Sequence, residues 1–299
     1  MMKRQVRAYC YATLAVLCWS TVASAFKISL RFTSSEMLLL ISSFGAFVVL
    51  ASLVVVTGQW RSWREWRGRD LGLSALLGLL NPFVYYLVLF QAYDLLPAQE
   101  AQPLNFIWPF VLVAFSVLFL KQRVHFLSIA AMLVSFFGVL VISTRGNLIG
   151  LQITDKLGVA LALGSSIVWA LYWTLTINDR IEPLARLCVN FFFGVIFTAI
   201  YLCYFGKFTM PSVNGWIGGI YIGLFEMGLT FYFWLKALQL SKTTAQVSSL
   251  IFITPFFSLL LIHVLVGEPV YASTLPGLLL IIGGILIHQF VDRKMNSAV

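Results

Sequence analysis

The chain has 299 residues and a net charge of +9, and 60% of its residues are apolar while only 10% are charged. A soluble globular domain carries about 25% charged residues, so this chain lacks the polar residues that a water-exposed surface needs, and a soluble protein is excluded. The apolar residues come in blocks of about twenty, the length that a helix needs to cross ~30 Å of hydrocarbon. The sequence therefore predicts an all-α integral membrane protein.

Ten apolar blocks predict ten transmembrane helices. They cover residues 8–30, 36–57, 71–93, 98–120, 124–143, 157–178, 184–205, 215–236, 243–265 and 271–291. The first block also resembles a secretory signal, because "KRQVR" precedes it and Ala23–Ala25 resembles a cleavage site. Its apolar region exceeds the ~7–15 residues of a signal core, so we predict a mature first span. Since the connections are short, we expect no extramembrane catalytic domain.

The basic residues assign a side to each loop. With the N-terminus in the cytoplasm, fifteen of the 20 Lys and Arg residues fall on the cytoplasmic side and five on the other. Cytoplasmic loops are expected to carry this excess. We therefore predict that both termini are cytoplasmic and that the number of spans is even.

The densest basic segment is "WRSWREWRGRD", residues Trp60–Asp70, between the second and third spans. Interleaved basic and aromatic residues also suit nucleic acid. However, the tryptophans are three residues apart beside a span end, as expected of an interfacial anchor above anionic lipid. We predict an anchor and no nucleic-acid partner.

The first and third spans carry aromatic and polar residues away from their ends. Trp19 lies in the first span, next to Ser20, and the third span has Asn81 and Tyr85 four positions apart. Apolar pockets with a few polar groups are typical of ligand sites, although Trp and Tyr are more often interfacial belt residues. We predict that Trp19, Asn81 and Tyr85 contact a substrate.

The fourth span contains "QPLNFIWPF", Gln102–Phe110, with two prolines. A proline has no amide hydrogen, so Pro109 frees the carbonyl of Asn105, four residues earlier, and Pro103 does the same for Gln99. Free carbonyls in hydrocarbon belong beside a cavity or within protein. The sequence predicts a bent helix, and a packing kink without a ligand is the alternative.

One face of this bent helix is polar. Gln102, Asn105 and Pro109 lie at helical spacing, with Trp108 at the edge of the face. We expect this face to line a hydrated path and assign Gln102, Asn105 and Trp108 to the substrate site. In the ninth span, Gln246, Ser249 and Pro255 repeat the pattern more weakly, and we assign Pro103, Pro109 and Pro255 to gating kinks.

The sixth and eighth spans add further candidates. A stripe of polar and aromatic residues in the sixth includes Trp169 and Tyr172, which we assign to the substrate site. Glu226 is the only acidic residue deep inside a span, where a charge costs about 2.5–3.5 kcal/mol. Three roles stay open for Glu226: a proton-coupling carboxylate, a contact to a substrate amine, or a protonated structural residue.

The chain contains an internal repeat. Residues 146 apart are alike, so that Pro109 matches Pro255 and Gly138 matches Gly284. Asn81 and Glu226, 145 apart, are nearly equivalent. Each repeat holds five spans, over residues 1–150 and 151–299. Five crossings place the second repeat upside down relative to the first, a plan that recurs in secondary transporters with a substrate site near the midplane.

Several segments carry a family resemblance. They are "CWS" and "VWA" in the first span of each half, "YYLVLFQAYDLLPAQEA", "FYFWLKALQLSKTTAQV", "TPFFSLLLIHVLVGEPV" and "GLLLIIGGILI". With ten spans in two repeats, the chain resembles the EamA-type branch of the drug/metabolite transporter superfamily. The resemblance implies a carrier, most similar to exporters of aromatic and neutral amino acids in the bacterial inner membrane. Gly267–Glu268 matches Lys121–Gln122 in the first half, so we assign that pair no shared chemical role.

Other classes of function lack their motifs. The sequence has no GxxxxGK[ST] for phosphate, no HExxH and no GxSxG, and its four cysteines show no metal-like spacing. We expect no enzyme activity, no cofactor and no metal. We predict export of a small-molecule substrate from within the lipid bilayer by alternating access, with proton coupling left open. Efflux of hydrophobic or cationic drugs and a passive solute channel are the alternatives.

Overall fold

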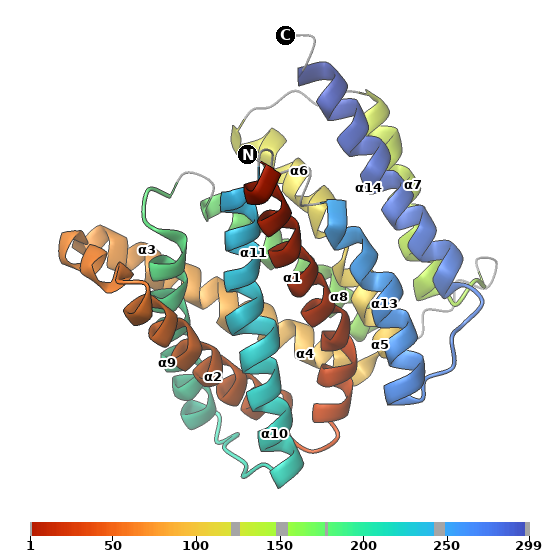
Figure 1. Ribbon diagram of the computed structural model, residues 1–299. Coiled ribbons are helices and arrows are strands. Elements are labelled where there is room, and N and C mark those ends of the chain that lie inside the picture. The colour runs from red at the N-terminus through yellow and green to blue at the C-terminus, as the bar shows by residue number, and fades with distance from the viewer. Residues whose placement is uncertain (1, 121–125, 148–154, 177–178, 242–248, 297–299) are drawn as a thin grey trace. The chain divides into compact units, whose positions relative to one another are not determined.

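The computed structural model describes residues 2–120, 126–147, 155–176, 179–241 and 249–296, and within these ranges all regular elements are helical (Figure 1). The α-helices are α1 (Met2–Ser29), α2 (Ser35–Val56), α3 (Gly68–Gly78), α4 (Tyr85–Leu95), α5 (Ala98–Asn105), α6 (Trp108–Leu120), α7 (Phe126–Ser143), α8 (Lys156–Thr176), α9 (Pro183–Tyr204), α10 (Val213–Ile222), α11 (Leu229–Leu240), α13 (Thr254–Leu261) and α14 (Thr274–Asn296). Short 3₁₀ or π segments join some of them, namely η1 (Gln59–Glu65), η2 (Leu79–Val84), η3 (Gly223–Gly228), η4 (Ser249–Ile253) and η5 (Ile262–Val266).

Six of the predicted spans are confirmed as helices that are long and apolar enough to cross a membrane. In the described part of the chain they are Arg4–Ser29, Ser35–Val56, Gly68–Leu95, Lys156–Thr176, Pro183–Tyr204 and Val213–Leu240. Shorter apolar helices, at Leu133–Ile142, Thr254–Val266 and Thr274–Ile287, lie in the ranges predicted for the fifth, ninth and tenth spans. The chain is therefore an all-helical, multi-pass membrane protein.

The helices form two compact units, each built from two separate stretches of chain. Unit 1 contains Met1–Phe90 and Asn178–Gly267, and unit 2 contains Gln91–Ile177 and Glu268–Val299. The two halves expected from the sequence, 1–150 and 151–299, stay a prediction, and each compact unit takes helices from both of them.

In unit 1, α1 packs against α10, α11 and α13, while α2 and α3 pack against α9. Small side chains allow the closest approach: Ala8, Ala12 and Ala15 of α1 lie against Trp234 and Ala237 of α11. Small residues at membrane-helix contacts let backbones approach closely. The first and eighth predicted spans are thus held together by this stripe of alanines.

Two glycines of unit 1 make equivalent backbone contacts. A methyl group on Gly78 would meet the carbonyl oxygen of Asn190, and one on Gly223 would lie 2.6 Å from the carbonyl oxygen of Ser42. Gly78 and Gly223 are 145 positions apart, and Ser42 and Asn190 are 148 apart. The contact of the third span with the seventh is therefore repeated between the eighth and the second.

In unit 2, α14 packs along α7. Gly138 of α7 lies against Gly277 and Ile281 of α14, and Gly284 of α14 lies against Ala131 and Ser135 of α7. A shift of 146 converts the first set of contacts into the second. Because residue numbers rise along α7 as they fall along α14, the two helices run antiparallel.

Four of the predicted spans are interrupted where polar or proline residues stand. Asn81 (φ −141°, ψ 116°) is non-helical within η2, and Glu226 lies in η3, so the two near-equivalent polar residues occupy corresponding π segments. Pro109 and Pro255 are each the second residue of a new helix, α6 and α13, where a missing amide hydrogen costs little. The third span was predicted as one continuous helix, but π segments break it and its counterpart, as is frequent at functional sites.

Candidate functional site

Glu226 lies inside unit 1, where its side chain is 7% exposed. Its Oε1 accepts a 2.9 Å hydrogen bond from the hydroxyl of Tyr86. The side chain of Trp19 also interacts with the carboxyl group, but Oε2 is buried without a hydrogen bond of standard geometry from any described residue.

Aromatic rings surround this carboxyl group. Trp19 lies 5.4 Å from Trp234 and 6.3 Å, edge-on, from Phe231, measured between ring centroids. The rings of Tyr85 and Tyr86 are 4.7 Å apart. Trp19, Tyr85 and Glu226 therefore lie in one region of unit 1, and their role in binding a substrate stays a prediction.

Several neighbours of Glu226 were missing from the predicted set. Tyr86 follows Tyr85 directly in the sequence, and its hydroxyl donates a hydrogen bond to Glu226. Cys18 lies beside Thr230 and close enough to Glu226 for an electrostatic interaction. Cys18 precedes Trp19 in the "CWS" motif, and this adjacency was the available signal. Thr230 carried no signal, because a lone threonine in a span is common.

A second group of polar side chains is buried around the interrupted third span. Asn81 is fully buried, and neither its Oδ1 nor its Nδ2 has a hydrogen-bond partner among the described residues. The same holds for Asn190 on α9, which the sequence analysis missed. An unbonded buried polar group costs about 1–3 kcal/mol, so such groups call for an explanation such as a ligand or another conformation.

Unit 2 gathers four other predicted residues on α5, α6 and α8. Asn105 donates a 2.8 Å hydrogen bond from Nδ2 to the hydroxyl of Ser165. Trp169 and Tyr172 stack with ring centroids 5.9 Å apart, and the ring of Trp173 meets Trp169 edge-on. Trp108 is half-buried at the start of α6, and α6 packs against α8.

The remaining predicted residues have these positions. Gln102 is half-buried and Pro103 is buried, both within α5, and Pro255 is buried at the start of α13. The side chains of Pro109 and Ser249, and all of Gln246, lie outside the described residues.

The start of α5 is fastened by residues from later in the chain. The carboxylate of Glu268 accepts hydrogen bonds from the backbone N–H groups of Ala98 (3.0 Å) and Gln99 (3.4 Å), which are otherwise unsatisfied at a helix start. Glu100, buried one residue further, accepts a 2.8 Å hydrogen bond from Nε of Arg145. Glu268 therefore has a local role, as the cap of the helix that carries Gln102 and Asn105.

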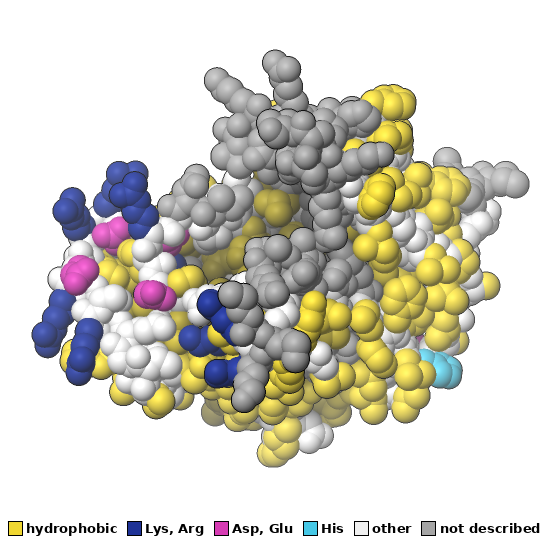
Figure 2. Space-filling model, turned by 45° about the horizontal axis from the view of Figure 1, so that its top comes forward, with side chains coloured by type: hydrophobic (Ala, Val, Ile, Leu, Met, Phe, Trp, Pro, Cys, Tyr) yellow, Lys and Arg dark blue, Asp and Glu magenta, His cyan; other side chains and the backbone are white. Residues whose placement is uncertain are grey.

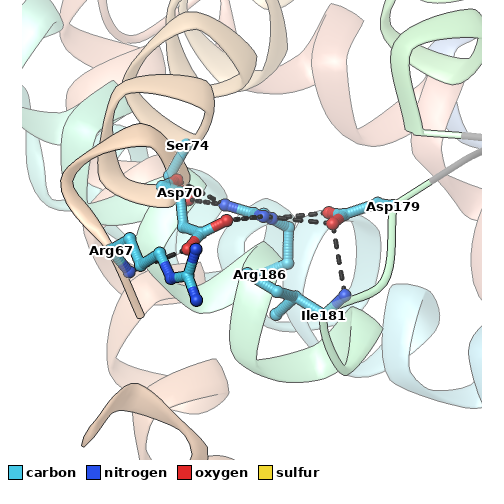
Figure 3. A network of polar contacts seen from close by, with 6 residues as sticks. All are labelled: Arg67, Asp70, Ser74, Asp179, Ile181 and Arg186. Carbon is cyan, nitrogen blue, oxygen red and sulfur yellow. Dashed lines mark hydrogen bonds and ion pairs between the residues drawn. The ribbon is translucent and has the colours of Figure 1, made fainter. Parts of the chain in front are cut away.

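An ion-pair network in unit 1 joins the start of α3 to the start of α9 (Figure 3). Arg186 is 4% exposed and binds Asp179 through two hydrogen bonds, of 2.6 and 3.1 Å. Its Nη1 also donates to the carbonyl oxygen of Asp70 and the hydroxyl of Ser74. With its partners this close, the buried charge is compensated, so we interpret the network as structural.

A comparison with known families decides the class of protein. The sequence model of the EamA-like transporter family matches residues 6–144 and, a second time, residues 156–288. The chain belongs to the EamA-like transporter family. Together the two matches leave only the ends and a short central segment of this transporter uncovered.

Individual relatives of the transporter agree with this family. An uncharacterized transporter of Clostridium kluyveri is 29% identical over 238 residues, which cover 77% of this chain and 76% of that protein. An uncharacterized transporter of Archaeoglobus fulgidus is 24% identical and covers 92% and 95% of the two chains. The aromatic amino acid exporter YddG of Ancylobacter novellus is 24% identical over 74% of this chain and 75% of its own.

A solved crystal structure also resembles the transporter. The two chains are 20% identical, the match covers 98% of this chain and 99% of the other, and the TM-score is 0.70. At 20% identity this similarity shows a shared fold.

Proposed function

We propose that this transporter exports small amphiphilic metabolites, chiefly aromatic and neutral amino acids, across the bacterial inner membrane by alternating access. The observation that carries the proposal is the carboxyl group of Glu226. It is buried in an interrupted helix beside Trp19 and Tyr86, which both interact with it, and its Oε2 forms no hydrogen bond of standard geometry with any described residue. A substrate ammonium group is a donor of the right charge, and a charged hydrogen bond of this kind contributes about 1.5–3 kcal/mol.

The surroundings of Glu226 favour an apolar side chain on the substrate. Phe231 and Trp234 each contact Trp19, which interacts with the carboxyl group. Aromatic walls with few polar groups suit amphiphilic ligands. In unit 2, Trp169 and Tyr172 form a second aromatic surface. The similarity to an exporter named for aromatic amino acids points the same way.

Alternating access is supported by signs of an inverted repeat. The family model matches the chain twice. The contacts of Gly138 with α14 and of Gly284 with α7 are interchanged by a shift of 146, between antiparallel helices. Two helices related by a two-fold axis make each contact twice, once in each direction, as these two glycines do. Inverted repeats of this kind are common in alternating-access carriers.

Ten crossings with both termini in the cytoplasm are supported by contacts between span ends. Arg186 binds Asp70, Lys207 binds Glu36, and Arg145 binds Glu100. In each pair an even number of predicted crossings separates the two residues, as it must for segments on one side of a membrane. The excess of basic residues supports a cytoplasmic location for the Asp70–Arg186 side.

Counterflow in proteoliposomes tests the proposed substrate. Vesicles loaded with unlabelled phenylalanine should accumulate labelled phenylalanine, with saturation, and a panel of amino acids should compete in order of side-chain apolarity. Transport of a cationic dye without amino-acid counterflow would favour drug efflux instead. Flux that rises linearly with concentration and shows no counterflow would favour a channel.

A matched pair of variants tests Glu226. Glu226→Gln keeps the shape and an acceptor for Tyr86 but loses the charge, so we expect the KM for phenylalanine to rise at least about tenfold. Glu65→Gln, at an exposed position in η1, should leave KM unchanged. An unchanged KM in Glu226→Gln together with a lost response to a pH gradient would assign Glu226 to proton coupling and not to the substrate amine.

A further inference from the structure

The segment between α2 and α3 carries exposed Trp and Arg side chains that have no role in the proposed transport. Residues Gln59–Glu65 form the 3₁₀-helix η1, in which side chains three positions apart lie above one another. The sequence alternates Trp and Arg with that spacing. Trp60 and Trp63 therefore make one ridge, and Arg61 and Arg64 make the adjacent ridge.

Both ridges are exposed. Trp60 and Trp63 are each 36% exposed, and the guanidinium groups of Arg61 and Arg64 lie 5.7 and 5.5 Å from the centre of the Trp60 ring. Figure 2 shows Lys and Arg side chains at the left, with a few Asp or Glu side chains among them, where Figure 1 places the orange segment of η1 and α3.

The positive charge of this segment is not neutralised within the described part of the protein. The guanidinium groups of Arg61, Arg64, Arg67 and Arg69 form no ion pair there, and all four residues are exposed. The one acidic residue between the four arginines is Glu65. The next acidic residue, Asp70, is already engaged by Arg186.

The backbone beneath the arginines is held in place. The carboxylate of Asp70 accepts a 2.8 Å hydrogen bond from the backbone N–H of Arg67. The ring of Trp66 lies 4.8 Å from the buried guanidinium of Arg186, so Trp66 turns inward and does not continue the ridge of Trp60 and Trp63. The exposed arginines therefore project from a fixed turn, which lowers the entropy lost when they bind a ligand.

The position of the segment in the chain indicates which ligand it binds. The segment connects two helices that are long and apolar enough to span a membrane, Ser35–Val56 and Gly68–Leu95, so it lies at a membrane boundary. Tryptophan prefers the headgroup level, and basic residues close to a membrane surface attract anionic lipids by about 1 kcal/mol each. We propose that Arg61, Arg64, Arg67 and Arg69, beside the ridge of Trp60 and Trp63, form a binding site for the phosphate headgroups of anionic phospholipids.

A lipid titration of the full-length protein in detergent, followed by native mass spectrometry, tests this site without any transport measurement. The probes are phosphatidylglycerol and phosphatidylcholine with the same acyl chains. We expect the wild type to prefer phosphatidylglycerol, and Arg61→Gln/Arg64→Gln to weaken phosphatidylglycerol binding about 10- to 30-fold, given about 1 kcal/mol per arginine. Its phosphatidylcholine binding should stay at the wild-type level, which reports an intact fold.

Three further measurements test whether lipid binding depends on these arginines and on the lipid rather than on net charge or free phosphate. Arg7→Gln/Lys156→Gln removes two exposed charges elsewhere and should keep the preference for phosphatidylglycerol, and Arg61→Lys/Arg64→Lys should keep most of it. Millimolar inorganic phosphate should not displace the lipid. Equal losses in the two charge-removing double variants, no loss in Arg61→Gln/Arg64→Gln, or displacement by inorganic phosphate would each overturn the proposal.

Discussion

Ser135 donates a 2.8 Å hydrogen bond to the carbonyl oxygen of Ile281, and these residues are 146 positions apart, the spacing of the predicted repeat. A residue meets its own counterpart only where a two-fold axis passes between them. The pair therefore marks the contact of α7 with α14 as the centre of the proposed symmetry within unit 2.

Adjacent glycines of α14 provide a test of this contact. A methyl group on Gly284 would meet the carbonyl oxygen of Ala131 and the hydroxyl of Ser135, whereas one on Gly283 would meet open space. We expect Gly284→Ala to destabilise the protein by about 1–3 kcal/mol through overpacking, and Gly283→Ala to be neutral or stabilising by up to about 1 kcal/mol. Thermal unfolding in detergent measures both. Equal effects of the two variants would contradict the described packing.

Tyr86→Phe removes the 2.9 Å hydrogen bond that the Tyr86 hydroxyl donates to Oε1 of Glu226 and keeps the ring. A typical hydrogen bond contributes about 1 kcal/mol, so we expect the KM for phenylalanine to rise about fivefold as the carboxyl group loses its fixed orientation. Tyr204→Phe, at an exposed position, is the control. A KM equal to the wild-type value would show that Tyr86 does not position Glu226 for substrate.

Arg186→Ala leaves Asp179 without its partner in the network of Figure 3. Removal of one member of a buried ion pair typically costs about 3–5 kcal/mol, and we expect a large loss of folded protein and a lower unfolding temperature. Arg180→Ala changes an exposed arginine of the same segment and should have little effect. Similar melting curves for both variants would argue against a compensated buried charge at Arg186.

Glu268→Ala removes the cap of α5. We expect a loss of about 1 kcal/mol in stability, as for other N-terminal caps, together with a higher KM because α5 carries Gln102 and Asn105. Glu268→Gln retains one acceptor oxygen and should be intermediate. Glu182→Ala serves as control, since Glu182 precedes α9 without a side-chain hydrogen bond to that helix. A change in stability without any change in KM would limit Glu268 to a structural role.

The ion pair of Lys207 with Glu36 should make the stability of the protein depend slightly on pH. The hydrogen bond to the carboxylate of Glu36 raises the pKa of Lys207, although partial burial acts in the opposite direction. A raised pKa stabilises the folded state below the unfolded value of about 10.4, and this stabilisation is lost as pH rises through the folded pKa. Because the side chain is 43% exposed, we expect Lys207→Gln to cost less than about 1 kcal/mol. The cost should be constant from pH 7 to about pH 9 and should vanish at higher pH. Lys156→Gln, at an exposed position, controls for net charge.

The substrate site stays a prediction, but some of the residues assigned to it lie close together in the structure. Trp19, Tyr85 and Glu226 were expected together and lie in one region of unit 1, because a charged or bulky aromatic residue inside an apolar span is visible as an exception in the sequence. Asn190 was missed although it is as buried as Asn81, since it lies near the start of its span, where a polar residue is unremarkable. The interruption at Asn81 was missed as well, because hydropathy measures composition and not backbone geometry.

The sequence by itself determined the membrane class, six of the ten predicted spans and the unusual position of Glu226 inside an apolar segment. These properties are one-dimensional: they depend on which residues stand in a row and at what separation. Only the tertiary structure decided that Tyr86 binds Glu226, that Glu268 caps α5, and that Arg186 draws Trp66 away from the exposed ridge. Each of these contacts depends on which helix faces pack together. Close packing and hydrogen bonds between buried polar groups that are distant in the sequence determine this arrangement.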